Sequence, residues 1–303
     1  MTPSTPSDPT ASPSPGPRAP ADRSARRMPL ALATVSLVGV VLVLVAVLFA
    51  VKVTHGSTGS GPPPTPLAPA ALVTQATTVP AGVLDVVGAP GPPLVTPPAR
   101  LAHAQPLRSG GRALVVYVGA EYCPFCAAER WALVVALSRF GTFSHLGLAT
   151  SSSQLVFPGL QSFSFRGVSY RSPYVAFDAV ETYGSDTTAS SGDFAPLQPL
   201  TGQASTLMQR LDVPPLAPVP STLPFVDLGG RYVAVGSGFS PGILAGRPMD
   251  AIATDLAQAT SPVAQAVDGT ANELTAAICS STGQQPASVC GSPAAQDGRL
   301  RTR

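Results

Sequence analysis

Apolar residues in the middle of the chain follow two patterns, which together predict a strand followed by a helix. Residues Ala113 to Val118 form a continuous apolar, β-branched run between glycines, which is typical of a strand covered on both faces. From Pro124 to about Phe140 the apolar residues recur at helical spacing, and Gly141 ends the run. This spacing turns Trp131, Val134, Val135 and Leu137 inward and leaves Glu129, Arg130, Ser138 and Arg139 to solvent.

The next strand is expected at His145 to Thr150, which would complete a β-α-β unit with the elements before it. Such a crossover places its two strands parallel in one sheet. The segment that follows is too long for the linkers of a minimal fold, so we treat residues 151–220 as an insertion. Within it, a Gly/Ser/Asp-rich loop is expected at Tyr183 to Asp193.

The C-terminal half of the domain carries clear turn and helix signals. A tight hairpin is predicted from Ser221 to Val233, with Gly229 and Gly230 as its turn. Further helices are expected at Met249 to about Ala259, at Pro262 to Ser280 and, in short form, within Leu72 to Val87. We therefore expect one α/β domain over residues 72–292, followed by a disordered tail at 293–303.

The first third of the chain has no pattern of this kind. Residues 1–29 are a Pro/Ser/Thr-rich tail that we expect to be disordered and cytoplasmic. Residues 30–51 carry no charge and span about 33 Å as a helix, enough for a bilayer core, which predicts one transmembrane helix. A cleaved signal peptide is the alternative, but its apolar region is usually shorter. Residues 52–71 then form a Gly/Ser/Pro linker.

The distribution of charge gives the orientation of this helix. Arginines precede it and only Lys52 follows closely, so the positive-inside rule places the N-terminus in the cytosol and the C-terminal domain outside the cell membrane. Basic and acidic residues balance beyond Val51, and the net charge of +2 belongs to the tail. A neutral exterior lacks the electrostatic footprint of nucleic-acid binding, so no nucleic acid is expected as a partner.

The candidate chemistry lies where the first strand meets the helix. Cys123 and Cys126 form a Cys-Pro-Phe-Cys sequence in the first helical turn, where unpaired N–H groups and the helix dipole stabilise a thiolate. Pro124 suits the first helical position. The spacing permits a disulfide, so we assign Cys123 as the attacking thiol and Cys126 as the resolving thiol.

Two other interpretations of this pair remain open. A Cys-x-x-Cys can be half of a zinc site, but Cys279 and Cys290 are separated by a longer loop and the histidines are scattered. We therefore expect neither a metal nor another cofactor. The pair can also be an inert structural disulfide.

The remaining two cysteines suggest a structural disulfide. Cys279 ends the last predicted helix, and Cys290 follows a turn-rich loop. Four cysteines allow three connectivities, and pairing by proximity in the sequence is the simplest. Outside the cell such a bond would persist and contribute about 3 kcal/mol.

The sequence resembles a known family over most of residues 70–292. The matching blocks run from Tyr117 to Leu133, from Ala136 to Gly141, from Phe165 to Ser172, from Leu223 to Tyr232, and from Ala277 to Cys290. They are similar to the domain of unknown function 929 family of membrane-anchored actinobacterial and archaeal proteins. That family has no established reaction, and the resemblance implies a thioredoxin-like domain outside the membrane.

A wider resemblance bears on mechanism. Leu223 and Pro224, placed before a strand and a glycine turn, are similar to the cis-proline loop of thioredoxin-like proteins. The resemblance implies that the Leu223–Pro224 bond is cis and that this loop faces Cys123 and the substrate. Tyr122 stands where thioredoxins usually carry Trp, and Pro-Phe replaces Gly-Pro between the cysteines, so the direction of electron flow stays open.

Two hypotheses follow. The first is a membrane-anchored extracytoplasmic thiol-disulfide oxidoreductase without a bound cofactor, which acts on exported cysteine-containing proteins or small thiols and is recycled by a membrane redox partner. The second is a non-catalytic thioredoxin-like binding module in which both disulfides are structural. An exposed Cys123 that faces Pro224 would favour the enzyme, and a buried Cys123 the binding module.

Overall fold

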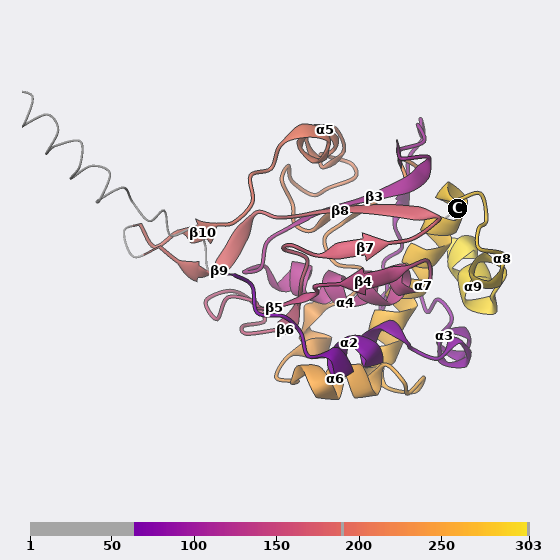
Figure 1. The fold of residues 1–303 in the computed structure, drawn as a ribbon, viewed down its shortest axis with the longest axis horizontal. Helices are drawn as coiled ribbons and strands as arrows, with labels where there is room; N and C mark the ends of the chain where they lie inside the picture. Colours follow the sequence, from indigo (N-terminus) through magenta and orange to yellow (C-terminus); the bar gives the residue numbers. More distant parts are fainter. Residues whose placement is uncertain (1–63, 189–190, 302–303) are drawn as a thin grey trace, which may run out of the picture. The chain divides into compact units, whose positions relative to one another are not determined.

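The computed structural model describes residues 64–188 and 191–301 (Figure 1). The predicted transmembrane helix at 30–51 lies outside these residues. Among the described residues, no single helix is long and apolar enough to cross a membrane, although α2 (Ala70–Thr77) and α3 (Ala81–Val87), bent by 53°, pass this test as a pair on length and composition. Both helices contribute buried side chains to the core of the domain.

The fold is mixed α/β, with a central mixed sheet and flanking helices. Strand β3 (Arg112–Gly119) is the predicted apolar run, and every residue after Arg112 is buried. It pairs in parallel with β8 (Val175–Glu181) and antiparallel with β11 (Phe225–Leu228). The sheet continues from β11 to β12 (Tyr232–Val235), and its remaining short strands are β1 (Ala99–Arg100) and β2 (Arg108–Ser109).

Alternate residues of β3 enter different layers, as the pleat of a strand requires. Val115 and Tyr117 pack in the core that contains α4 (Pro124–Ser138) and α7 (Pro262–Ser281). Leu114, Val116 and Val118 pack in a second core with α5 (Gly202–Leu211). In Figure 1, α5 accordingly lies on one side of the sheet and α4 with α7 on the other.

The β-α-β unit exists, but its second strand is not the predicted one. The expected strand at His145 to Thr150 is β5 (Gly147–Thr150), which pairs antiparallel with β6 (Gln161–Ser164) in a separate two-stranded sheet. The parallel partner of β3 is β8, which matches it over seven register positions, whereas β5 has only four residues. The expected insertion at 151–220 therefore supplies β8 to the central sheet.

Other parts of that segment form smaller elements. Strand β4 (Thr142–Ser144) pairs with β7 (Ser169–Arg171). Where a loop is predicted at Tyr183 to Asp193, β9 (Tyr183–Thr187) pairs with β10 (Phe194–Pro196). Aromatic contacts explain this difference, because Tyr122 stacks on Phe194 at 4.0 Å between ring centroids and also contacts Tyr183.

The helix after the cysteines is confirmed, but the prediction that Glu129 and Arg130 face solvent was wrong. Both side chains are fully buried. The sheet covers one face of α4, while α7 and β6 cover others, so nearly the whole helix is inside. Glu129 accepts a hydrogen bond from the Gly238 N–H at 2.8 Å, and Arg130 has partners of its own in the core.

The hairpin of β11 and β12 is confirmed, with Gly229 and Gly230 both at positive φ in its turn. Beyond it lie the 3₁₀ helix η1 (Pro241–Leu244) and α6 (Met249–Asp255). The C-terminus is not a disordered tail from 293 on, because α8 (Ala287–Cys290) leads into α9 (Pro293–Arg301). Two alanines of α9, Ala294 and Ala295, are buried, and α9 packs closely on α7.

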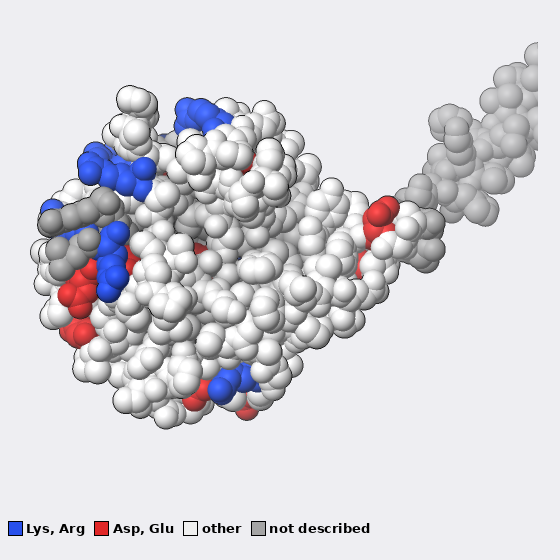
Figure 2. Space-filling view, turned by 180° about the vertical axis from the view of Figure 1, so that it is seen from behind, with Lys and Arg blue, Asp and Glu red and all other residues white. Residues whose placement is uncertain are grey.

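Charged residues are sparse on the surface of the described part. On the face seen in Figure 2, the Arg, Asp and Glu residues lie in a few small groups, some of which contain both charges, with a broad uncharged surface between them. Contacts made by this uncharged surface depend on shape and apolar area rather than on charge.

Candidate functional site

The two thiols of the Cys-x-x-Cys lie at the start of α4, directly beyond the carboxyl end of β3. Cys123 is the N-cap residue, with extended backbone angles, and Pro124 occupies the first helical turn. The Cys126 N–H donates to Cys123 Sγ at 3.2 Å. The sulfur thus takes the place of the hydroxyl or carboxylate oxygen that usually caps a helix, and it receives one of the N–H groups left free at the helix start.

Both thiols are free and shielded from solvent. Cys123 is 6% exposed and Cys126 is fully buried. They form a small cluster with Ala120, against which the half-buried side chains of Tyr122 and Leu223 pack. Of the two residues, Cys123 is the more exposed.

The loop before β11 meets the first thiol. The Leu223–Pro224 peptide bond is cis, and the Cys123 thiol donates to the Leu223 carbonyl oxygen at 3.9 Å. The fold therefore brings Leu223 next to a cysteine that lies far from it in the sequence. Their contact follows from the pairing of β11 with β3, which places the start of one strand beside the end of the other.

The surroundings of the two sulfurs move their pKa values apart. The pKa of the Cys123 thiol is lowered, chiefly by a hydrogen bond from the Cys126 thiol, while burial opposes this effect and the backbone N–H groups of the helix start support it. The pKa of Cys126 is raised well above its ordinary value, mainly because the side chain is buried and because Cys123 holds the negative charge. Of the two thiols, Cys123 is therefore the one that loses its proton more readily.

A buried ion pair lies beneath the cysteines. Arg130, one helical turn after Cys126, contacts both carboxylate oxygens of Glu181 at 3.2 Å, and neither side chain is exposed. The same guanidinium nitrogen donates to the Tyr117 hydroxyl at 3.2 Å and to the Ala120 carbonyl oxygen at 3.3 Å. Residue 120 belongs to the cysteine cluster, so the ion pair is joined to it directly.

Arg130 is the functional candidate that sequence reasoning missed. Its positive charge lowers the pKa of Cys123 and of Cys126. Burial would lower the pKa of the guanidinium itself, but the Glu181 carboxylate and the Tyr117 hydroxyl outweigh it and hold the proton. The signal in the sequence was an arginine four residues after Cys126, on a helix whose only other charged residue is Glu129.

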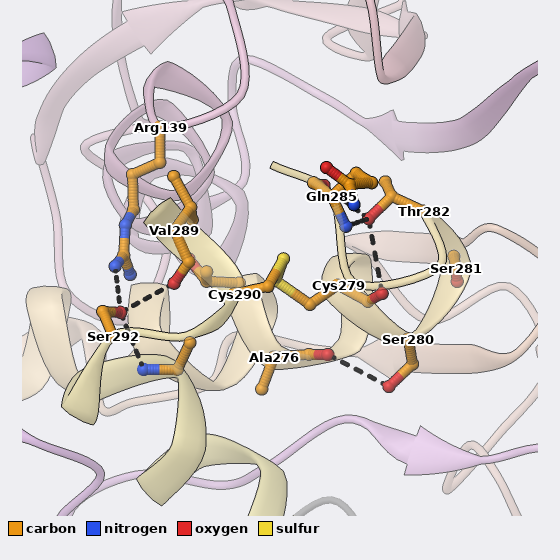
Figure 3. Close-up of a disulfide and its surroundings, with 12 residues drawn as sticks. Arg139, Ala276, Cys279, Ser280, Ser281, Thr282, Gln285, Val289, Cys290 and Ser292 are labelled. Carbon is orange, nitrogen blue, oxygen red and sulfur yellow. Dashed lines mark hydrogen bonds between the residues drawn. A yellow bond between two sulfur atoms is a disulfide. The ribbon is translucent and has the colours of Figure 1, made fainter. Parts of the chain in front are cut away.

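The other expected sites stand apart from this cluster. Cys279 and Cys290 are joined by the expected disulfide, which ties the end of α7 to α8 (Figure 3). Beside it, Arg139 of α4 donates to the Ser292 hydroxyl at 2.9 Å, so the disulfide region is also held to the CxxC helix. Within residues 64–188 and 191–301, no group of three or more His, Cys, Asp or Glu side chains is placed to hold a metal ion.

Comparison with known proteins places this arrangement in one family. Residues 101–280, more than half of the chain, match the family described as Domain of unknown function (DUF929). The chain belongs to the DUF929 family. No curated protein and no solved structure matches it.

The matched region of this DUF929 protein includes the whole candidate site. The cysteines of α4, the Arg130–Glu181 pair and the Leu223–Pro224 loop all fall within residues 101–280. Cys290 lies beyond that region, as do α8 and α9.

Proposed function

We propose that this DUF929 protein is a thiol-disulfide oxidoreductase whose redox pair is Cys123 and Cys126. The observation that carries the proposal is the position of the Cys123 sulfur, which accepts the Cys126 N–H at the start of a helix and lies beside the cis Leu223–Pro224 loop. The lowered pKa of this sulfur favours its thiolate, which is the form that attacks disulfides.

The reaction needs only the two sulfurs of the protein. In the reducing direction, the Cys123 thiolate attacks one sulfur of a substrate disulfide, forms a mixed disulfide and releases the other substrate sulfur as a thiolate. Cys126 loses its proton and attacks Cys123 Sγ. The Cys123–Cys126 disulfide forms, the second substrate thiolate leaves, and two electrons have passed to the substrate. Reversal of these steps oxidises a substrate dithiol.

The order of elements supports a thioredoxin-like interpretation of the fold. A strand that leads into a Cys-x-x-Cys helix, a parallel neighbour, and a cis-proline loop before an antiparallel hairpin and a last helix make up the thioredoxin-like arrangement implied by the sequence resemblance. In this chain these elements are β3, α4, β8, the Leu223–Pro224 loop, β11 with β12, and α7.

We place the domain outside the cell membrane, anchored by residues 30–51. The apolar length and the flanking arginines of that segment support this location. The Cys279–Cys290 disulfide is consistent with it, because such bonds persist in oxidising compartments. Exported cysteine-containing proteins or small thiols are then the substrates, and a membrane redox partner restores the pair.

One observation favours a second candidate, a non-catalytic binding module. Cys123 is only 6% exposed, and Tyr122 and Leu223 cover it. If Tyr122 and Leu223 stay in place, no substrate disulfide can reach the Cys123 sulfur. Cys123 and Cys126 would then only stabilise the domain.

Redox titration separates the two candidates. The full-length protein, purified in mild detergent, is equilibrated across glutathione redox buffers, and alkylation of each cysteine is mapped by mass spectrometry. We expect Cys123 and Cys126 to titrate together well above about −300 mV while Cys279 and Cys290 stay oxidised. The second disulfide is the internal control, and equal resistance of all four cysteines to reduction would favour the binding module.

A further inference from the structure

A cavity of about 540 Å³ opens beside the cysteine cluster. Its floor includes Val118 and Thr182, at the carboxyl ends of the parallel strands β3 and β8. The segment 196–200 forms one wall, Met208 of α5 another, and Leu223 with Tyr122 the side next to the thiols. In open α/β sheets, ligands bind outside the carboxyl ends of the strands, at the point where the connections after two neighbouring strands lead to opposite faces of the sheet. The parallel strands β3 and β8 provide such a place, because the chain continues from β3 into α4 on one face of the sheet and from β8, by way of β9 and β10, to α5 on the other.

The cavity and the redox pair share two side chains. Tyr122 and Leu223 line the cavity and also pack against Cys123. A group seated in the cavity therefore touches the same residues that cover the sulfur. The volume lies in the range of sites that enclose a ligand, and the cavity extends from the thiol side as far as α5.

The lining of the cavity is uncharged. It consists of apolar and aromatic side chains with three polar ones, Thr182, Gln198 and Ser221. Among the described residues, no charged side chain lines it, and the nearest pocket, which shares Tyr122, Tyr183 and Pro196 with it, contains one carboxylate, that of Asp193. A carboxylate or an ammonium group that entered the cavity would lose water and find no counter-ion in this lining, which costs free energy.

We propose that this cavity is the substrate site of the redox pair and that it takes uncharged apolar side chains next to a cysteine in an exported polypeptide. This inference rests on the proposed function and restricts the substrates of the redox pair to polypeptides with apolar residues near the reacting cysteine. Glutathione and similar anionic low-mass thiols are disfavoured, because their carboxylates meet an apolar wall. A polypeptide can instead fill the cavity with one or two side chains while its cysteine reaches Cys123.

Three peptides test the proposal. Each carries one cysteine as a mixed disulfide with a thiopyridyl group, flanked by Leu and Val, by Asp and Glu, or by Lys and Arg. The reduced full-length protein gives two electrons to each disulfide and releases thiopyridine, which is followed by absorbance. We expect the second-order rate constant of this single turnover to be about tenfold or more higher for the apolar peptide than for either charged peptide, the usual value of a well-fitted apolar contact. Equal values for the three peptides would overturn the proposal.

A positive charge placed in the cavity wall formed by residues 196–200 should shift the preference from the apolar peptide toward the acidic one. Leu200 lines the cavity, is half-buried and lies in a loop before α5, so L200R is expected to fold. We expect L200R to slow the apolar peptide and to speed the acidic one relative to the native protein. The control is V219R, which adds the same charge at an exposed position outside the cavity. An unchanged order of the peptides in L200R would contradict the proposal.

A small neutral disulfide, 2,2′-dithiodipyridine, distinguishes this inference from the function on which it rests. If the protein reduces this probe but does not discriminate among the peptides, the oxidoreductase stands and the cavity is not its substrate site. If it reduces neither the probe nor any peptide, both proposals fail.

Discussion

Arg130 and Glu181 bring opposite charges into a region where neither side chain reaches solvent. Burial removes each charge from water, which costs free energy, and the attraction between the two side chains is the main compensation. The loss of one side chain therefore leaves an unpaired buried charge. The Arg130 Nε and Nη2 atoms have no hydrogen-bond partner among the described residues, so Glu181 is the main compensation for this charge. The stability of the site therefore depends on the pair as a unit.

We expect R130M to lower the free energy of unfolding by about 3–5 kcal/mol, because Glu181 would remain buried without its partner. The double variant R130M/E181Q should recover most of this loss, since no charge then remains. Urea unfolding at one fixed redox state measures both. A double variant as unstable as R130M would show that the guanidinium stabilises the domain by packing rather than by charge.

The double variant also tests the effect of Arg130 on the thiols. In the native protein, the pH midpoint for alkylation of Cys123 by iodoacetamide should lie below that of an ordinary thiol, and Cys126 should stay unmodified. In R130M/E181Q the midpoint should rise, because a positive charge near the sulfur is gone. An unchanged midpoint would limit Arg130 to a structural role.

Among the helices and strands, those that the sequence predicts correctly are the ones whose limits are set by nearby residues. Strand β3, helix α4 and the β11–β12 hairpin each consist of an apolar run bounded by Gly or Pro, and all three are present. The parallel partner β8 was missed because it is only partly buried and carries the charged residues Asp178 and Glu181, and because pairing depends on distant residues. The burial of Arg130 was missed for a similar reason, since its partners Tyr117 and Glu181 come from β3 and from the unpredicted strand β8.

The candidate site likewise contains parts that the sequence predicts and a part that depends on pairing between distant residues. Its cysteines come from a local motif, and the Leu223–Pro224 loop comes from a family resemblance. Glu181 was not predicted, because nothing near residue 181 in the sequence indicates that β8 lies beside β3 and below the cysteines.

The contact between α9 and α7 requires a small residue. A Cβ added at Gly298 would lie 2.6 Å from the Asn272 carbonyl oxygen and 3.0 Å from the Ala276 Cβ. We expect G298A to loosen α9, seen as faster hydrogen exchange over residues 293–301. The matched control is G82A in α3, where a Cβ meets nothing within 4 Å and should stabilise the helix by about 0.5–1 kcal/mol. Unchanged exchange of α9 in G298A would contradict this packing.

The Cys279–Cys290 disulfide joins the end of α7 to α8, apart from the cluster of Cys123 and Cys126. Removal of the Cys279–Cys290 bond in C279A/C290A should cost about 3 kcal/mol, because the bond restricts the unfolded chain. The alkylation rate of Cys123 should stay the same, because the two cysteine pairs belong to separate clusters. A changed alkylation rate would show that the disulfide at the end of α7 influences Cys123 at the start of α4.

Across the whole molecule, burial raises the pKa values of several carboxyl groups. The pKa is raised to about 7 for Glu129, about 6 for Asp227 and about 8 for Glu273, and it is also raised for Asp268. Because the folded state binds these protons more tightly than the unfolded chain, the stabilisation is complete below the ordinary carboxyl pKa. It is lost as the pH rises through 6 to 8.

We therefore expect the protein to resist urea better at pH 5 than at pH 8. The variant E129Q keeps a side-chain oxygen for the Gly238 N–H and removes one titrating group, so its midpoint should depend less on pH. A native urea midpoint that rises from pH 5 to pH 8 would contradict the expectation.

The position of β3 in the sheet also decides the order in which the chain can fold. Val116 of β3 pairs with Asp178 of β8 and with Asp227 of β11, both synthesised much later. Until the ribosome has released the chain beyond Leu228, where β11 ends, this apolar strand has no complete set of neighbours, and contacts of such high sequence separation form slowly. An emerging chain must therefore be kept from aggregating for most of its synthesis, and holding chaperones should raise its yield.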